Sequence, residues 1–571
     1  MAVEEIRNNL VQTMASLLSL DAAELDAMFE APRQREHGDL ALPCFKLAKQ
    51  LRQPPPKIAA DLEAKLKAAG LPAGVEKIEQ LAGYLNFTFA AEAVAGSALQ
   101  DILSAGESYG SSTIGKGQKV VLEYSSVNIA KPFGIGHLRS TIIGAALARV
   151  HQKLGFEVVR INHLGDWGTQ FGKLIAAYRL WGSEIEFGDN AIYDLYQLYV
   201  RFHEAAKDDP TLEERGREEF RKLEAGDPDS RQLWQRFHEL SMRDFNRLYA
   251  LLKVEFDYLT GESFYEDKMG PVLQQLQEKK LLIASEGAEV VNLDKYEMPA
   301  CLMRKSDGAT LYATRDLAAL LYRKATFDFD RILYIVGSAQ ELHFRQFFKV
   351  AELMGYDWVP QRAQHVGFGW VKFSGQMMST REGTLVFVQE VIDRAKALAH
   401  EVVLRENPDV ENVEWISEKV AVAALVFTQL RVRRNRDVNF IWEDALSFRG
   451  DTGPYLQYTH ARLSSLARKY GKTLPDVTAD LPLLGDEEKQ IIKLLGDYPE
   501  RVQRVLDNYE TSVLTDYLLE LAGEMNSYWQ RVRIITDDGS LTKARMQMAY
   551  AVRIVIADGL RLLGIEPLER M

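Results

Sequence analysis

The central part of the chain alternates short apolar runs with a segment that has helical spacing. KVVLEY (119–124) and FEVVRIN (156–162) are rich in β-branched residues and predict two buried strands. Between them, HLRSTIIGAALARVHQKLG (137–155) has apolar residues at helical spacing and ends in Gly155. This order predicts a βαβ unit with parallel strands and a right-handed crossover. The polar loop SSVNIAKPFGIG (125–136) is then expected beyond the carboxyl end of the first strand, where such sheets bind their ligands.

Other patterns flank this unit on both sides. Residues 1–113 combine amphipathic helical segments with the alternating run GYLNFTF (83–89), which is typical of a small α+β domain. Residues from about 169 to 300 predict a mostly helical insertion, in which the charged stretch 207–231 is a solvated face.

The α/β pattern resumes after the insertion. TLYAT (310–314), RILYIVG (331–337) and HVGFGWVKF (365–373) predict strands, AQELHFRQFFKVAELMG (339–355) predicts a helix, and SGQMMSTREGT (374–384) predicts a loop. From 389 onward every long segment has helical period. We therefore predict a multidomain α/β protein with an α+β domain over 1–113, a parallel-sheet domain over 114–405 and an all-α domain over 406–571.

Composition narrows the class of protein. With 571 residues and 47% hydrophobic content, the chain is long enough for several domains, yet its apolar runs, such as 420–427, fall short of the roughly 18 residues of a membrane helix. Only two cysteines are present, and the acidic N-terminus has no apolar core. We therefore expect a cytoplasmic protein without a signal peptide, a disulfide framework or a cysteine zinc site. The net charge of −12 neither suggests nor excludes a nucleic-acid partner.

Three stretches carry candidate chemistry. Gly134, Gly136 and His137 lie where a loop becomes a helix, so phosphate binding competes with a simple capping or packing role. Arg139 occupies the third position of the GxGxxG spacing, which argues against a dinucleotide fold. The loop 376–383 is either a surface turn or a ligand loop. RVRRNR (431–436), expected on a helix, is either a solvated face or a phosphate contact.

Several longer motifs together resemble the class I aminoacyl-tRNA synthetases, and within them the arginyl-tRNA synthetases. In order they are KPFGIGHLRST (131–141), NHLGDWGTQFG (162–172), LYATRDLAA (311–319), YIVGSAQELHF (334–344), MMSTREG (377–383), GDTGPYLQYTHAR (450–462) and GLRLLGIEPLERM (559–571). HGDLALPCFKLAK (37–49) and GYLNFTF resemble the additional N-terminal domain of that family.

The resemblance implies a Rossmann-like catalytic domain between an N-terminal tRNA-binding domain and a helical anticodon-binding domain. It also implies ATP-dependent formation of arginyl-adenylate, then transfer to the 3′-terminal adenosine of the tRNA, with tRNA required for the first step. The expected partners are L-arginine, ATP carrying Mg²⁺ and the tRNA specific for arginine. The protein is expected to act as a monomer, to bind no zinc and to hold no metal of its own.

The matching positions imply these roles. His137, Lys131, Ser379 and Arg381 are catalytic, and Gly134, Gly136, His137, His343, Val366 and Met378 bind ATP. Glu123, Ser125, Asn128, Tyr312, Asp316 and Gln340 bind arginine, and Arg431, Arg433, Arg434, Tyr528, Trp529 and Arg533 bind tRNA.

Two departures from the family pattern leave other functions open. Gly134 stands where the first histidine of the HIGH-type motif is usual, and the KMSKS-type loop lacks both lysines, for which Lys131 substitutes. The alternatives are a non-catalytic tRNA-binding paralogue, a synthetase for another amino acid and a different nucleotidyltransferase of this fold.

Overall fold

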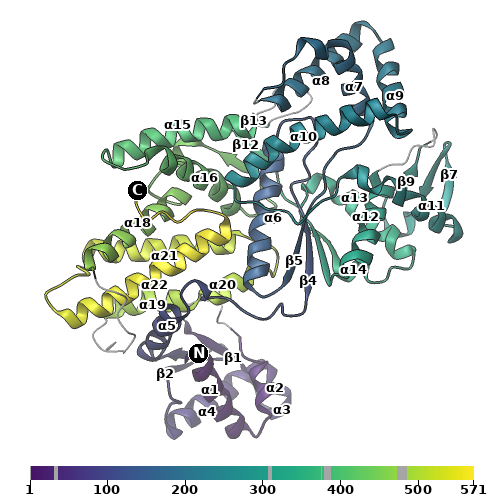
Figure 1. The fold of residues 1–571 in the computed structure, drawn as a ribbon. Coiled ribbons are helices and arrows are strands. Elements are labelled where there is room, and N and C mark those ends of the chain that lie inside the picture. The colour runs from purple at the N-terminus through teal and green to yellow at the C-terminus, as the bar shows by residue number, and fades with distance from the viewer. Residues whose placement is uncertain are drawn as a thin grey trace.

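The centre of the protein is a five-stranded parallel sheet in the order β11-β10-β4-β5-β6 (Figure 1). The structure is a computed structural model and describes residues 2–30, 32, 37–188, 190–305, 312–373, 376–377, 387–471 and 485–571. The strands are β4 (Lys119–Glu123), β5 (Glu157–Asn162), β6 (Tyr258–Leu259), β10 (Arg331–Tyr334) and β11 (Ala363–His365). Helix α6 (Ile135–Lys153) joins β4 to β5, so the predicted βαβ unit is confirmed.

Both faces of this sheet are covered. Val120 and Leu122 of β4 belong to one large hydrophobic core, while Val121 points into a second core on the opposite face. Helix α6 and the C-terminal helices contribute to the first core. Helices α11 (Met269–Glu278), α12 (Tyr312–Phe327) and α13 (Glu341–Leu353) form the second. A strand buried on both faces explains why its sequence is a continuous apolar run.

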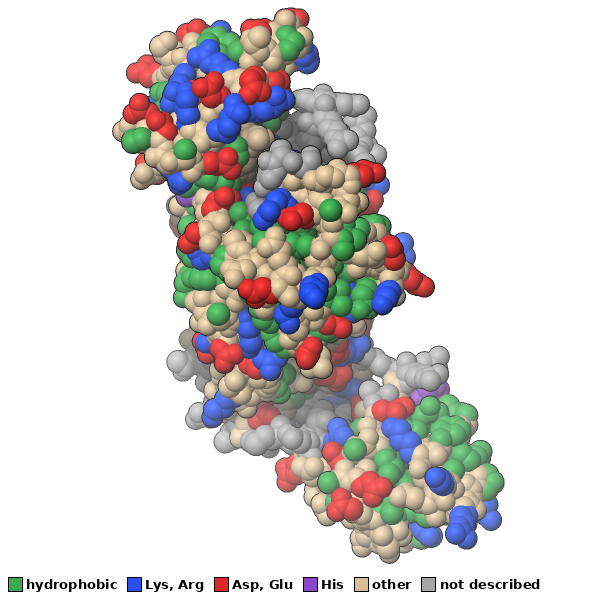
Figure 2. Space-filling view, turned by 90° about the vertical axis from the view of Figure 1, so that its right-hand side faces the viewer, with side chains coloured by type: hydrophobic (Ala, Val, Ile, Leu, Met, Phe, Trp, Pro, Cys, Tyr) green, Lys and Arg blue, Asp and Glu red, His purple; other side chains and the backbone are tan. Residues whose placement is uncertain are grey.

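The insertion is helical mainly in its first two thirds, and α11 adds one helix beyond them. It contains α7 (Thr169–Trp181), α8 (Ala191–Asp208), α9 (Thr211–Glu224) and α10 (Pro228–Leu251), after which the chain returns to the main sheet as β6. Acidic and basic side chains mix on the lobe formed by these helices at the top of the molecule, as the solvated-face prediction requires (Figure 2). A small antiparallel sheet of β7 (Leu282–Ser285), β8 (Ala288–Val291) and β9 (Cys301–Arg304) follows, where helix was expected.

The strand predicted over TLYAT is wrong. Residues 310 and 311 lie outside the described residues, and Tyr312 is the first residue of α12. Thr314 is fully buried on this helix, where its hydroxyl donates to the carbonyl oxygen of Met303 at 2.6 Å. Two threonines and a tyrosine favour a strand locally, but packing of the helix against β9 decides the conformation.

The N-terminal domain has its own core. Its helices are α1 (Ala2–Leu18), α2 (Ala22–Asp26), α3 (Ala48–Leu51) and α4 (Pro55–Ala69), and its antiparallel sheet has the order β1-β3-β2, from β1 (Leu40–Pro43), β2 (Val75–Leu81) and β3 (Tyr84–Phe89). The next helix, α5 (Ala91–Ala105), leaves this lobe and packs on α19 (Asp486–Gly496) and α22 (Gly539–Leu563) (Figure 1). Leu99 and Ile102 of α5 are fully buried in the large core, so the independent unit ends near Phe89.

The C-terminal third is a helical bundle. It comprises α15 (Val388–Glu406), α16 (Val413–Arg431), α17 (Trp442–Ala445), α18 (Gly453–Tyr470), α19 (Asp486–Gly496), α20 (Tyr498–Arg504), α21 (Ser512–Arg531) and α22 (Gly539–Leu563). The apolar run 420–427 lies on α16 and is buried on all sides, and no helix among the described residues is long and apolar enough to cross a membrane. Strand β14 (Val438–Phe440) pairs with β12 (Val371–Phe373), which in turn pairs with β13 (Gln376–Met377).

Candidate active site

The loop after β4 holds an unusual backbone conformation. Ser125, Ser126 and Ala130 have φ values of 72°, 50° and 59°, a region that side-chain-bearing residues rarely adopt. Two hydrogen bonds from other elements support it: Ser126 N donates to Asn162 Oδ1 at 3.1 Å, and Ala130 N donates to Ser241 Oγ at 2.9 Å. Such strain persists only where the surroundings impose it, and it concentrates at functional sites.

Asn128 is held in this loop by a close backbone approach. It forms a parallel bridge with Gly165, whose N–H donates to the carbonyl oxygen of Val127 at 2.9 Å. A Cβ atom on Gly165 would lie 2.1 Å from Asn128 Oδ1. The motif around Gly165 therefore positions the Asn128 side chain.

The other end of the loop is positively polarised. Gly134 is the N-cap of α6, and the Cβ of any residue there would contact only His137 Nδ1, at 3.7 Å. Burial, and next the charge of Lys131, lowers the pKa of His137 to about 4, so this imidazole is neutral near pH 7. Its Nδ1 has no hydrogen-bond partner among the described residues. The free N–H groups at the start of α6 favour an anion here.

Lys131 adds a cation to this end. Its Nζ lies 5.2 Å from the ring centre of Tyr199, and burial lowers its pKa. None of the residues that the structure describes places a carboxylate within ion-pair distance of it. A half-buried lysine without a counter-ion is suited to bind a phosphate.

The contacts of Arg139 explain why an arginine occupies the third glycine position of the GxGxxG spacing. The side chain is fully buried, and its Nη1 donates to the carbonyl oxygens of Gly369 at 2.6 Å and Arg436 at 2.7 Å. It thus joins α6 to the segments that enter β12 and β14. The arginine at this position therefore stabilises the packing of these segments and is not part of a dinucleotide site.

Carboxylates gather on the other side of the loop. Asp316 on α12 is bonded to His343 on α13, with 2.5 Å between Oδ2 and Nε2. Glu262 contacts Arg315 at 3.4 Å, and Asp166 accepts from Ser263 N at 2.8 Å. Burial raises the pKa of Glu262 to about 7; Arg315 opposes this rise, and Asp166 and Asp316 add to it.

Glu262 and Asp166 were not among the predicted site residues. Asp166 belongs to the motif NHLGDWGTQFG, which was a usable signal. Glu262 follows the two-residue strand β6, which is too short to recognise from periodicity.

Glu123, a predicted arginine-binding residue, is paired within the protein. Its Oε2 accepts a hydrogen bond from Arg323 Nη1 within a buried ion pair, and Arg323 also contacts His163. Arg323 therefore balances the charge of Glu123, whose role in binding arginine stays a prediction.

The remaining predicted residues of the site are distributed as follows. Ser125 is buried and its Oγ lies 2.8 Å from the hydroxyl of Tyr249. Tyr312 is 66% exposed, Gln340 is exposed at the N-cap of α13, and Val366 is fully buried with its N–H on the carbonyl oxygen of Tyr334. Met378, Ser379 and Arg381 lie outside the described residues. No group of three or more His, Cys, Asp or Glu side chains within the described ranges is arranged to hold a metal ion.

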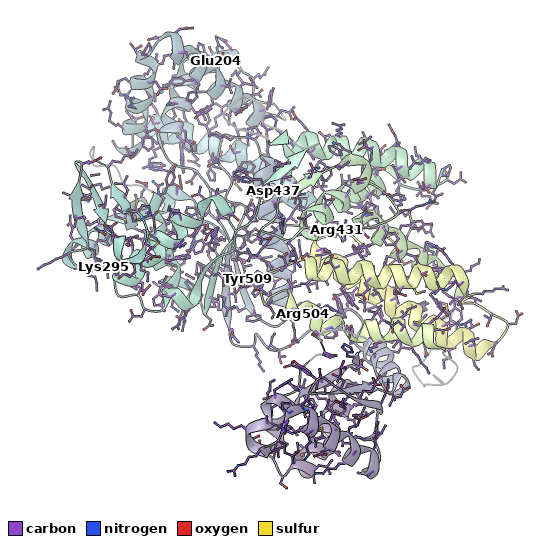
Figure 3. All side chains as sticks on the ribbon, turned by 180° about the vertical axis from the view of Figure 1, so that it is seen from behind. Glu204, Lys295, Arg431, Asp437, Arg504 and Tyr509 are labelled. Atoms are coloured by element: carbon purple, nitrogen blue, oxygen red, sulfur yellow. The ribbon has the colours of Figure 1, made fainter. Side chains whose placement is uncertain are left out.

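The arginine-rich segment 431–436 was expected on a helix, but only its first residue is helical. Helix α16 ends at Arg431, which pairs with Asp451 in the C-terminal part of the molecule (Figure 3). Arg434 donates to the carbonyl oxygens of Gly367 at 2.6 Å and Asn508 at 3.2 Å, so its guanidinium joins the segment before β12 to the segment after α20. Arg433 is exposed.

Tyr528 also needs correction. Its side chain is 1% exposed, and its hydroxyl donates to Glu488 Oε1 at 2.7 Å, so the ring cannot stack on a base. Trp529 is half-buried beneath the guanidinium of Arg462, 4.5 Å from the ring centre. Arg462 also lies over Tyr458, which is stacked against Phe448. Arg533 is exposed at the end of α21.

Comparison with known proteins matches all three parts of the chain. The family described as "tRNA synthetases class I (R), catalytic domain" matches residues 98–442, "DALR anticodon binding domain" matches 456–571 and "Arginyl tRNA synthetase N terminal domain" matches 4–89.

Individual proteins agree with these matches. "Arginine--tRNA ligase" of Clostridioides difficile is 44% identical, with 97% of each chain covered, and that of Clostridium botulinum strain Alaska E43 is 43% identical, with 99% and 100% covered. Among solved structures, the arginyl-tRNA synthetase of Thermus thermophilus has a TM-score of 0.80 at 27% identity, with 95% and 96% of the chains covered. The chain belongs to the arginyl-tRNA synthetase family of class I aminoacyl-tRNA synthetases.

Proposed function

We propose that the protein attaches L-arginine to its cognate tRNA, the reaction of the family to which it belongs. In the first step a carboxylate oxygen of arginine attacks the α-phosphorus of ATP, and pyrophosphate leaves. In the second step a hydroxyl of the 3′-terminal adenosine attacks the carbonyl carbon of the adenylate, and AMP leaves. Family membership and its class I catalytic domain support this proposal.

One observation supports it most directly: the two ends of the site have opposite polarity. Lys131 and the start of α6 form a cationic end, whereas Glu262, Asp166 and Asp316 form an acidic end. ATP is an anion, and the arginine side chain is a cation with five N–H donors. The two substrates therefore fit opposite ends of the loop, with their reacting groups between them.

The chain's own residues act mainly by positioning and neutralising charge. We assign His137 and Lys131 to the phosphate oxygens, on which negative charge grows as pyrophosphate departs. We propose that Mg²⁺ enters as part of the ATP substrate. Asn128, held by Gly165, and Gln340 are assigned to the α-amino and carboxylate groups of arginine.

Selection of arginine over lysine follows from the acidic end. A planar guanidinium satisfies several carboxylate oxygens at once, whereas an ammonium leaves some of them unpaired. Asp316 and Glu262 are assigned to the guanidinium, together with the exposed ring of Tyr312.

The test is ATP–pyrophosphate exchange with arginine, with and without the tRNA specific for arginine. We expect exchange only when this tRNA is present. In Asp316→Asn the KM for arginine should rise far more than that for ATP, because one negative charge of the acidic end is lost. Asp328→Asn, at an exposed aspartate directly after the end of α12, is the matched control. Equal rises in both KM values would contradict the assignment of Asp316.

The same assay separates the alternatives. Binding of tRNA without any exchange would indicate the non-catalytic paralogue, and exchange with another amino acid would indicate different specificity.

For tRNA contacts we propose Arg433, Arg533 and the row Phe448, Tyr458, Arg462 and Trp529, since stacked aromatic and guanidinium groups bind unpaired bases. We further propose a cytoplasmic monomer; light scattering tests the oligomeric state.

A further inference from the structure

We propose that His343 is a positioning residue of the arginine pocket, which fixes the carboxylate of Asp316, and not a ligand of ATP. This inference rests on the proposed function. It reassigns a histidine that the family resemblance places among the ATP contacts, and it adds a specificity determinant to the acidic end of the site.

The two side chains come from different helices. Asp316 lies on α12 and His343 on the first turn of α13, and the Nε2 and Oδ2 atoms are 2.5 Å apart. Both side chains are half-buried, with exposed fractions of 28% for Asp316 and 25% for His343. A hydrogen bond to a carboxylate in such surroundings is among the stronger side-chain interactions.

The imidazole has little freedom to turn away. Its ring centre lies 5.3 Å from that of Phe347 and 5.6 Å from that of Phe344. Phe347 is fully buried, and Phe344 is stacked on His365 at 4.4 Å, so this aromatic group is anchored in the core of the α13 side of the sheet. These contacts therefore hold the imidazole of His343 in place beside Asp316.

The geometry determines which nitrogen carries the proton. An ionised carboxylate only accepts hydrogen bonds, so Nε2 of His343 must be the donor. Nε2 is therefore committed to Asp316, and Nδ1 is the one ring nitrogen left for any further ligand. This arrangement suits support of Asp316, because the nitrogen that bonds the carboxylate cannot also donate to a phosphate oxygen.

The bond leaves Asp316 available to a ligand. No residue that the structure describes donates a hydrogen bond to its Oδ1 atom. With Oδ2 held by His343, the plane of the carboxylate is fixed while Oδ1 stays open, which is the preorganisation that a fork-shaped guanidinium donor requires. Lysine, with a single ammonium group, gains less from a fixed carboxylate plane.

The experiment compares three substitutions in the full-length enzyme, assayed by ATP–pyrophosphate exchange with the tRNA present. His343→Leu removes the donor, His343→Asn offers an amide too short to reach Asp316, and His343→Gln places an amide N–H near the position of Nε2. We expect the KM for arginine to rise about tenfold in the His343→Leu and His343→Asn variants, which is the low end of the effect of losing a charge-assisted hydrogen bond. In the His343→Gln variant it should return largely to the value of the unmodified enzyme. The KM for ATP should change less than twofold, about the resolution of the assay, because ATP does not contact His343.

A double-mutant cycle and a matched control complete the test. Asp316→Asn combined with His343→Leu should raise the KM for arginine no further than Asp316→Asn alone, because His343 acts only through that carboxylate. His365→Gln is the control, since this histidine also packs on Phe344 but bonds the carbonyl oxygen of Val336. It should leave the KM for arginine unchanged.

Several outcomes would overturn the inference. A rise in the KM for ATP that equals or exceeds the rise for arginine would return His343 to the ATP site. Additive effects in the cycle, or no difference between Asn and Gln, would show that it does not act through Asp316. Absence of arginine-dependent exchange in the unmodified enzyme would instead refute the proposed function itself.

Discussion

Lys131 and Glu262 mark the two ends of the candidate site, and burial shifts both pKa values toward the neutral form of each group. For Lys131 burial lowers the pKa, and for Glu262 it raises the pKa to about 7. A substrate group of opposite charge would favour the ionised form of each, although Glu262 already has one cation, Arg315, at 3.4 Å. Groups with such shifts concentrate at functional sites because substrate binding recovers the cost of their burial.

Arginine binding should depend on pH through Glu262. Below pH 7 this carboxyl is protonated in the free protein, and a protonated acid attracts a guanidinium less. We expect the KM for arginine to rise as pH falls from 8 to 6, by at most about tenfold per pH unit for one group. Binding at pH 7 should release a proton. Glu262→Gln should have a high KM that no longer varies over this range; the same slope in the variant would assign the effect to another group.

Lys131 should act on the other substrate. Lys131→Met preserves the length and apolar contact of the side chain but removes its charge, so the rate of exchange should fall by about 10²–10³. The KM for arginine should change little. Lys419→Met is the matched control, because Lys419 also lies over an aromatic ring, that of Trp415, but on α16 of the C-terminal bundle. A similar loss in both variants would mean that the cation–π contact, and not phosphate binding, is what matters.

At the scale of elements, the site depends on how the loop 125–134 is clamped between β4, β5 and α10. Asn162 at the end of β5 and Ser241 on α10 hold its backbone amides, and Gly165 holds Asn128. None of these partners is close to the loop in sequence. The loop conformation is therefore a property of the assembled sheet and insertion.

Gly165→Ala should disturb this clamp. The new Cβ would lie 2.1 Å from Asn128 Oδ1, so the side chain or the loop must move. We expect the free energy of unfolding to fall by about 1–3 kcal/mol and the KM for arginine to rise. Chemical denaturation and exchange measure the two effects. Gly270→Ala is the control: its Cβ meets nothing within 4 Å on α11, and the better helix propensity should raise stability by up to about 1 kcal/mol.

At the scale of the whole molecule, the N-terminal domain is a separate lobe with a separate core, seen at the lower end in Figure 2. The helix that follows it, α5, belongs to the C-terminal bundle through Leu99 and Ile102. Additional contact between the lobe and the bundle comes from the ion pair of Asp39 with Lys493. The lobe is thus positioned beside the bundle without sharing its core.

Removal of residues 1–89 should weaken tRNA binding and leave the arginine and ATP sites intact, because no residue of the lobe belongs to either of the two cores on the sheet. Filter binding measures the affinity for tRNA, and exchange at saturating tRNA measures the chemistry. Removal of residues 1–105 is the comparison, and it should also lower the unfolding temperature, since it exposes the core beneath α5. Unchanged tRNA affinity in the shorter deletion would refute a tRNA-binding role of the lobe.

The sequence by itself determined the fold class, the βαβ unit, the helical C-terminus and the family. Periodicity is a local property, and β4 and α6 are long and apolar enough to reveal it. The ordered motifs, from 131–141 to 559–571, identified the family because together they span nearly the whole chain.

Only the tertiary structure decided which residues are free to act. Tyr528 and Arg434 resembled ligand-binding residues in the sequence, yet both are bound to parts of the protein 40 and 67 residues away. The bond between Asp316 and His343, the loop clamps and the two-residue strand β6 likewise depend on contacts between distant segments. Burial and hydrogen-bond partners arise when separate elements pack together, and no local pattern encodes them.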